Sequence, residues 1–163
     1  MSEHAPHSGA HAPNAHLLPM LALMFVFTYT VMTAVMLDRM RDFNNNINKV
    51  WMSLLMVTLM LVIEGIVARR DDLLVAGVVA TLLVVAAIRA QFGVNTSQFL
   101  KSMIEHHSAA LLMSRRILHK TSDPRVAALA ASIIASQAEE IRYMRFLLRN
   151  PARTTRHSTR ALH

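Results

Sequence analysis

Three long apolar runs constrain the fold of this chain more than any other feature. They cover residues 17–37, 50–68 and 73–88 of a 163-residue chain that is 53% hydrophobic. An α-helix rises about 1.5 Å per residue, so the first run spans roughly the 30 Å hydrocarbon core of a bilayer. The third run is shorter, and we expect residues 90–94 to extend it. The sequence therefore predicts a membrane region of three helices over residues 17–94.

A cleaved signal peptide is the alternative interpretation of the first run. Such a peptide begins with a basic segment and ends in a small-residue cleavage site. All 17 Lys and Arg residues lie after Leu37, and no such site follows before Asp38. The pattern therefore favours a membrane helix.

Both ends of the chain have the composition of disordered segments. Residues 1–16 contain His4, His7, His11 and His16 among Ala, Pro, Ser and Gly. Irregularly spaced histidines define no fixed geometry, so we expect at most weak metal capture there. Residues 150–163 are basic and have no acidic residue. We expect a solvated tail, with anionic lipid as its alternative partner and no nucleic acid.

The pattern becomes amphipathic after the third apolar run. Apolar residues recur at helical spacing between positions 99 and 114. Either Thr96 or Ser97 is a suitable N-cap, and we expect this helix to end near His119.

A second amphipathic helix follows a clear start signal. Asp123 is a suitable N-cap, and Pro124 suits the first helical position because its missing N–H is not needed there. An apolar stripe follows over residues 126–148, and Pro151 ends it. The sequence thus predicts an antiparallel helical hairpin over residues 95–149.

The two amphipathic helices carry a candidate metal site. Paired members on each helix are three, four or seven residues apart, so they share a face. Imidazole and thioether ligands suit copper(I) and related soft ions, with silver or zinc as further options. The candidate ligands are Met103, His106, His107 and Met113 on the first helix, and Gln137, Glu140 and Met144 on the second.

A structural interpretation of the same residues stands beside the metal site. Methionines at helical spacing often fill a core, and Glu140 can bond a histidine with no metal present. Neighbouring residues on a helix are about 100° apart, so either His106 or His107 must point partly outward. A metal and a glutamate can also activate water, but nothing in the sequence marks a substrate pocket, and we expect no enzyme.

The motif residues resemble a known bacterial family, the domain of unknown function 305. The likeness covers both helices and the spacing within each. It rests on Met103, Ile104, His106, His107, Ala110 and Met113, then Asp123 and Pro124, then Ile133, Ile134, Gln137, Glu140, Ile141 and Met144. The family commonly has Pro before the paired histidines, where this chain has Glu105.

The resemblance implies a ferritin-like helical fold and binding of copper or silver outside the cytoplasm. It adds no enzymatic activity. A subgroup of the family is membrane-anchored, and the likeness then extends through residues 17–148. We therefore expect an all-α protein with three transmembrane helices and half of a four-helix bundle. A hairpin of this size is small for an independent core, so we expect either a homodimer or packing on the membrane helices.

The signals for membrane orientation conflict. The first loop carries Arg39, Arg41 and Lys49, and the second carries Arg69 and Arg70, which favours a cytoplasmic hairpin. A Met/His site in a chain without cysteine suits an oxidising compartment, and the resemblance agrees. We expect a multi-pass protein of the bacterial inner membrane with an extracytoplasmic hairpin.

Overall fold

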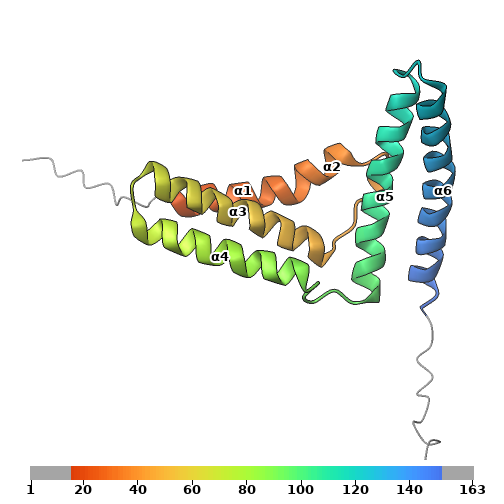
Figure 1. Cartoon of the computed structure of the whole chain (residues 1–163). Helices are drawn as coiled ribbons and strands as arrows, with labels where there is room; N and C mark the ends of the chain where they lie inside the picture. Colours follow the sequence, from red (N-terminus) through yellow and green to blue (C-terminus); the bar gives the residue numbers. More distant parts are fainter. Residues whose placement is uncertain (1–15, 152–163) are drawn as a thin grey trace, which may run out of the picture. The chain divides into compact units, whose positions relative to one another are not determined.

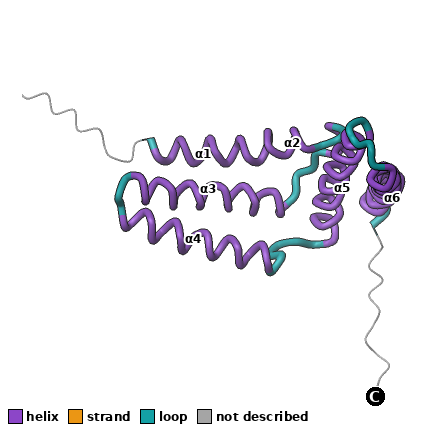
Figure 2. Tube along the Cα trace, turned by 45° about the horizontal axis from the view of Figure 1, so that its top comes forward, coloured by secondary structure: helices purple, strands orange, loops and turns teal. Residues whose placement is uncertain are grey.

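The computed structural model describes residues 16–151, and every regular element in this range is a helix (Figures 1 and 2). The predicted all-α class is confirmed. The predicted disordered ends, with His4, His7 and His11, lie outside the described residues, apart from His16, Asn150 and Pro151. Two compact units divide the described chain. The first contains residues 16–32 and Val50–Phe92, and the second contains Thr33–Lys49 and residues 93–151.

Three helical stretches are long and apolar enough to cross a membrane, as predicted. They are Leu17–Met36, Ile47–Val67 and Asp71–Arg89, with 20, 21 and 19 residues. The first consists of α1 (Leu17–Phe27), a π-helical turn η1 (Thr28–Met32) and α2 (Thr33–Met36), while α3 and α4 are the other two. The predicted extension of the third helix is wrong. Gln91 and Gly93 have φ of 50° and 76°, a left-handed conformation that a helix does not continue through.

Glycines set the close approach of α3 and α4. A Cβ on Gly65 would lie 2.5 Å from the backbone nitrogen of Leu74, and one on Gly77 would lie 2.8 Å from that of Val62. Any side chain at either position would push the two backbones apart. Small residues at contacts between apolar helices let the two backbones pack closely.

Glu64, the acid inside the second apolar run, has a polar neighbour. Its Oε1 lies 3.4 Å from Nε2 of His16, just before the start of α1. An acid in an apolar helix is stable when it pairs or reaches the polar interface. The contact places the start of α1 beside the carboxyl end of α3.

The second unit is built on α5 (Thr96–Leu118) and α6 (Pro124–Arg149), which lie side by side in both views (Figures 1 and 2). Asp123 caps α6 as predicted, because its side chain accepts a hydrogen bond from Arg125 N. The predicted caps of α5 are wrong. Asn95 takes this role and accepts from Gln98 N at 3.0 Å. Asparagine is as good an N-cap as serine and better than threonine, and it stands one position earlier.

A small apolar core joins α5 to α6. It consists of Leu100, Ile104, Leu111, Ile141 and Met144. Ile104 is 1% exposed. The apolar stripe expected from the sequence is wider than the buried seam, since Phe99, Val126 and Leu129 are exposed. Two helices alone bury only the strip along which they touch, and the stripe edges stay open.

Candidate metal site

His107 and Glu140 are the two predicted ligands that the structure brings into contact. His107 Nδ1, on α5, lies 3.1 Å from Glu140 Oε2, on α6. The histidine is 8% exposed, and the Glu140 side chain is half exposed. The nitrogen is buried and makes no hydrogen bond of good geometry. The pair links the two helices at one level of the seam.

The surroundings of His107 favour its neutral form. Burial lowers the pKa of the imidazole, the carboxylate of Glu140 partly opposes this, and His106 lowers it further. The imidazole is therefore neutral at pH 7, with a lone pair free to bind a metal ion.

Two of the predicted methionines line the same seam. Met144 is a buried member of the core, and Met103 packs against that core. Both thioethers therefore lie in an apolar setting on the buried side of the helices. Methionine at such places fills space and also offers a soft, uncharged sulfur ligand.

His106, Met113 and Gln137 lie apart from this seam or at its edge. The His106 side chain is exposed, and its ring centre lies 6.0 Å from that of His107. Met113 is 56% exposed. Gln137 is half-buried. Met113 instead lines an apolar groove of about 320 Å³ near the α5–α6 turn, together with Ala110, Ser114, Ile117, Val126, Leu129, Ala130 and Ile133.

Histidine and carboxylate side chains do not form a cluster in the described part of the chain. Residues 16–151 contain no group of three or more His, Cys, Asp or Glu side chains placed to hold one ion. Among the described residues, the candidate ligands between α5 and α6 are His107, Glu140 and the thioethers of Met103 and Met144. Such a set suits a soft ion and gives no cage for Ca²⁺ or Mg²⁺.

A polar stripe on α5 was not predicted from the sequence. Its residues recur at helical spacing beside the apolar core: Gln98, Ser102, Glu105, Ser108 and Arg115. Each one bonds the segment of residues 38–49. Gln98 Oε1 accepts from Ile47 N at 2.9 Å, and Ser102 Oγ bonds Asn48 Nδ2 at 3.2 Å. The segment predicted as a plain loop is thus docked along α5.

Glu105 is the centre of this stripe. Its carboxylate accepts from Asn44 N at 2.7 Å and from Asn46 Nδ2 at 2.8 Å, and it lies 2.6 Å from Lys49 Nζ. The same ammonium group lies 3.5 Å from the centre of the Phe43 ring. Glu105 therefore serves the docked segment and not the neighbouring histidines.

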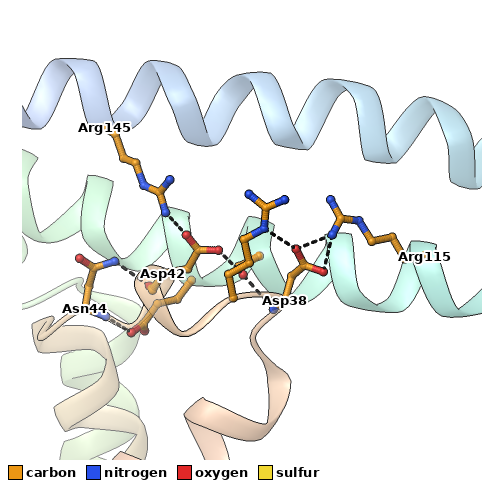
Figure 3. A network of polar contacts seen from close by, with 8 residues as sticks. Asp38, Asp42, Asn44, Arg115 and Arg145 are labelled. Carbon is orange, nitrogen blue, oxygen red and sulfur yellow. Dashed lines mark hydrogen bonds and ion pairs between the residues drawn. The ribbon is translucent and has the colours of Figure 1, made fainter.

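Two aspartates continue the docking toward α6 (Figure 3). Asp42 accepts from Ser108 Oγ at 2.7 Å and pairs with Arg145 of α6. Asp38 pairs with Arg115 Nη1 at 2.8 Å, and its backbone N–H donates to Ser108 Oγ at 3.0 Å. Ser108 is fully buried. Its single hydroxyl thus bonds both ends of this short turn.

Comparisons with known proteins agree with the motif. Residues 85–161 match the family model described as "Domain of unknown function (DUF305)". The chain is 34% identical to an uncharacterized protein, L153, of Acanthamoeba polyphaga mimivirus, over 140 residues that make up 83% of this chain and 92% of the relative. No solved structure matches. The bacterial source and the membrane-anchored subgroup stay predictions. The motif of paired histidines, its partner helix and the family match together place this chain in the DUF305 family.

Proposed function

We propose that this protein is a membrane-anchored, non-enzymatic protein that binds copper(I) or silver(I) between α5 and α6. Its role is metal handling or tolerance. The observation that carries the proposal is the buried Nδ1 of His107, which has no hydrogen-bond partner of good geometry and lies 3.1 Å from Glu140. Met103 and Met144 add thioether sulfur to the same seam.

The chemistry of this set fits a soft ion. A neutral imidazole and uncharged thioethers suit copper(I), and zinc is the second choice where the carboxylate binds as well.

Silver(I) titration of the full-length protein in detergent tests the proposal. We expect Met103→Leu with Met144→Leu to weaken binding at least about tenfold, or about 1.4 kcal/mol. Leucine keeps the volume of methionine, so the core stays packed while sulfur is lost. Binding should persist to a lower pH than an ordinary imidazole would allow, because burial holds the pKa of His107 below its usual value and delays its protonation. Calorimetry measures both effects.

Two matched variants serve as controls. Met52→Leu with Met56→Leu removes two exposed sulfurs from α3, and His119→Ala removes an exposed histidine at the end of α5. Neither should change the affinity. If the wild type and the Met103/Met144 variant bind silver(I) with equal affinity, the metal site does not lie between α5 and α6.

Homodimerisation is part of this proposal. The groove around Met113 leaves Ile117 and Leu129 exposed on the apolar side of α5 and α6. A second copy packed there would complete a ferritin-like four-helix bundle from two hairpins. It would also bring the candidate metal ligands of the second copy near those of the first. We expect light scattering, corrected for detergent, to give the mass of a dimer, and Leu129→Glu to give a monomer. A monomeric wild type at every concentration, with and without silver(I), would refute the bundle.

The proposed membrane placement puts the α5/α6 pair outside the cytoplasm. Three helices have the length and hydropathy to cross, so an odd number of spans would separate the N-terminus from the motif. Expressed in a bacterium, alkaline phosphatase fused after Leu148 should be active, because the enzyme needs an oxidising compartment. A stable but inactive fusion would place the pair in the cytoplasm, as the count of basic residues favours.

A structural module without metal is the second candidate function. The observation in its favour is that Glu140 already gives the buried His107 a charged neighbour within one chain. In this case the pair acts as a link between the helices, and thermal unfolding is the same with and without silver(I). A metal-dependent rise in melting temperature would exclude it.

A further inference from the structure

An open pocket in the second unit has arginine at half of its lining positions. It has a volume of about 230 Å³ and lies between the docked segment and the two long helices. We call it the arginine pocket. Its charged lining consists of Arg39, Arg41, Arg115, Arg142 and Arg145, with Asp38 and Asp42. Leu111, Ala138 and Ile141 form the apolar part of its wall.

The carboxylates of the pocket do not neutralise its arginines. Five guanidinium groups face two carboxylates, which leaves an excess of three positive charges. Asp38 pairs with Arg115 and Arg39, and Asp42 pairs with Arg145 (Figure 3). Both aspartate side chains are buried, at 6% and 3% exposure. These two carboxylates therefore fix the positions of Arg39, Arg115 and Arg145.

Two arginines of the pocket are left for a ligand. Arg41 and Arg142 are exposed and have no ion-pair or hydrogen-bond partner among residues 16–151. They come from the docked segment and from α6, so they approach the pocket from different elements. Like charges gathered in one concave place repel one another, and a bound anion would relieve that repulsion.

Phosphate is the anion that best fits this lining. Guanidinium groups bind phosphate oxygens in a bidentate manner, and several of them around one concavity can engage several oxygens. Arg115 is already oriented by the two oxygens of Asp38, which lie 2.9 and 2.8 Å from its Nη1. The site thus has arginines that are fixed beforehand and arginines free to close on a ligand.

The position of the pocket in the chain points to a lipid as the source of the phosphate. Asp38 stands two residues after the apolar stretch that ends at Met36. Two residues reach at most about 7 Å, which is also about the depth of the headgroup layer. If α1–α2 crosses the membrane, as proposed above, Arg39 and Arg41 lie at headgroup level.

We propose that the arginine pocket binds the phosphate of an anionic phospholipid headgroup, a site distinct from the proposed metal site. Native mass spectrometry of the full-length protein in detergent micelles tests it with phosphatidylglycerol, phosphatidylcholine and inorganic phosphate as separate probes. We expect retention of phosphatidylglycerol in preference to phosphatidylcholine. Arg41→Gln with Arg142→Gln should weaken this binding about tenfold or more, given the contribution of each arginine near anionic lipid.

Arg116→Gln with Arg149→Gln is the matched control. It removes the same charge from exposed positions outside the pocket and should leave lipid binding unchanged. Equal losses of lipid binding in the two double variants would overturn the proposal, and so would equal retention of the two lipids. Either result would mean that the positive charge of the protein attracts lipid without a specific site. Retention of inorganic phosphate that depends on Arg41 and Arg142, without lipid selectivity, supports the phosphate site and overturns the lipid source. Silver(I) affinity should be the same in both double variants. A failure of the lipid proposal can therefore be distinguished from a failure of the proposed metal site.

Discussion

Glu105→Ala is expected to destabilise the second unit by about 3–5 kcal/mol, the cost of breaking a buried ion pair by removing one of its members. The side chains of Glu105 and Lys49 are 11% and 5% exposed, and their charged atoms lie 2.6 Å apart. The substitution also removes the acceptor of Asn44 N and Asn46 Nδ2. The docked segment would then separate from α5, with Lys49 moving into water.

Urea titration of the full-length protein in detergent measures this loss, and hydrogen exchange locates it. Amide protons of the docked segment, residues 38–49, should exchange about a hundredfold faster or more, since each 1.4 kcal/mol of opening free energy is a factor of ten. Glu139→Ala is the control, because this acid is exposed on α6 and has no partner among the described residues. Equal stability of the Glu105 and Glu139 variants would show that the carboxylate does not hold the segment.

Asp42→Ala is expected to cost about 3 kcal/mol for the same physical reason. Asp42 is 2% exposed, accepts from Ser108 Oγ and pairs with Arg145. Its removal leaves a buried hydroxyl without an acceptor and a largely covered guanidinium group without an acid. The first cost falls on the contact of the docked segment with α5, and the second on its contact with α6.

A double-mutant cycle separates the ion pair from the other contacts. Combined with Arg145→Ala, the loss should be smaller than the sum of the two single losses by about 1–3 kcal/mol, as for residues in direct contact. The free energies of unfolding of four proteins give this coupling. Strictly additive losses would mean that Asp42 and Arg145 do not interact in solution. Asp42→Asn is a milder variant that keeps the shape and isolates the charge.

Hydrophobic periodicity was enough to predict the helices. Runs of apolar residues predicted three helices of membrane length, and the 3.6-residue pattern predicted α5 and α6 nearly to the residue. Asp123 and Pro124 fixed the start of α6. Asn95 was missed because two further capping residues, Thr96 and Ser97, follow it directly. Propensity alone does not choose among adjacent caps.

The docked segment could not be predicted in the same way. Its partners are polar, and an apolar pattern contains no information about them. The spacing of Gln98, Ser102, Glu105 and Ser108 is helical, but a polar helical face usually meets water. Only a complementary partner makes it a buried surface, and that partner lies about 60 positions earlier in the chain.

The candidate metal site was predicted in part. His107 belongs to the apolar stripe with Ile104 and Leu111, which explains why it, and not His106, is buried. Its contact with Glu140 follows from the meeting of the two stripes. The exposure of Met113 was not expected, because the apolar stripe in the sequence does not show how wide the buried contact between two isolated helices is. In the proposed dimer, the groove around Met113 would be covered.

X-ray absorption at the copper edge is the most direct measurement of the proposed metal site. Full-length protein loaded with one equivalent of copper(I) should show sulfur together with nitrogen or oxygen neighbours around the metal. The histidines of residues 1–16 can supply only nitrogen, and Met1 is the one methionine in that range. Met103→Leu with Met144→Leu should remove the sulfur signal, while Met52→Leu with Met56→Leu should keep it. A wild-type spectrum with nitrogen and oxygen neighbours only would contradict a copper site between α5 and α6.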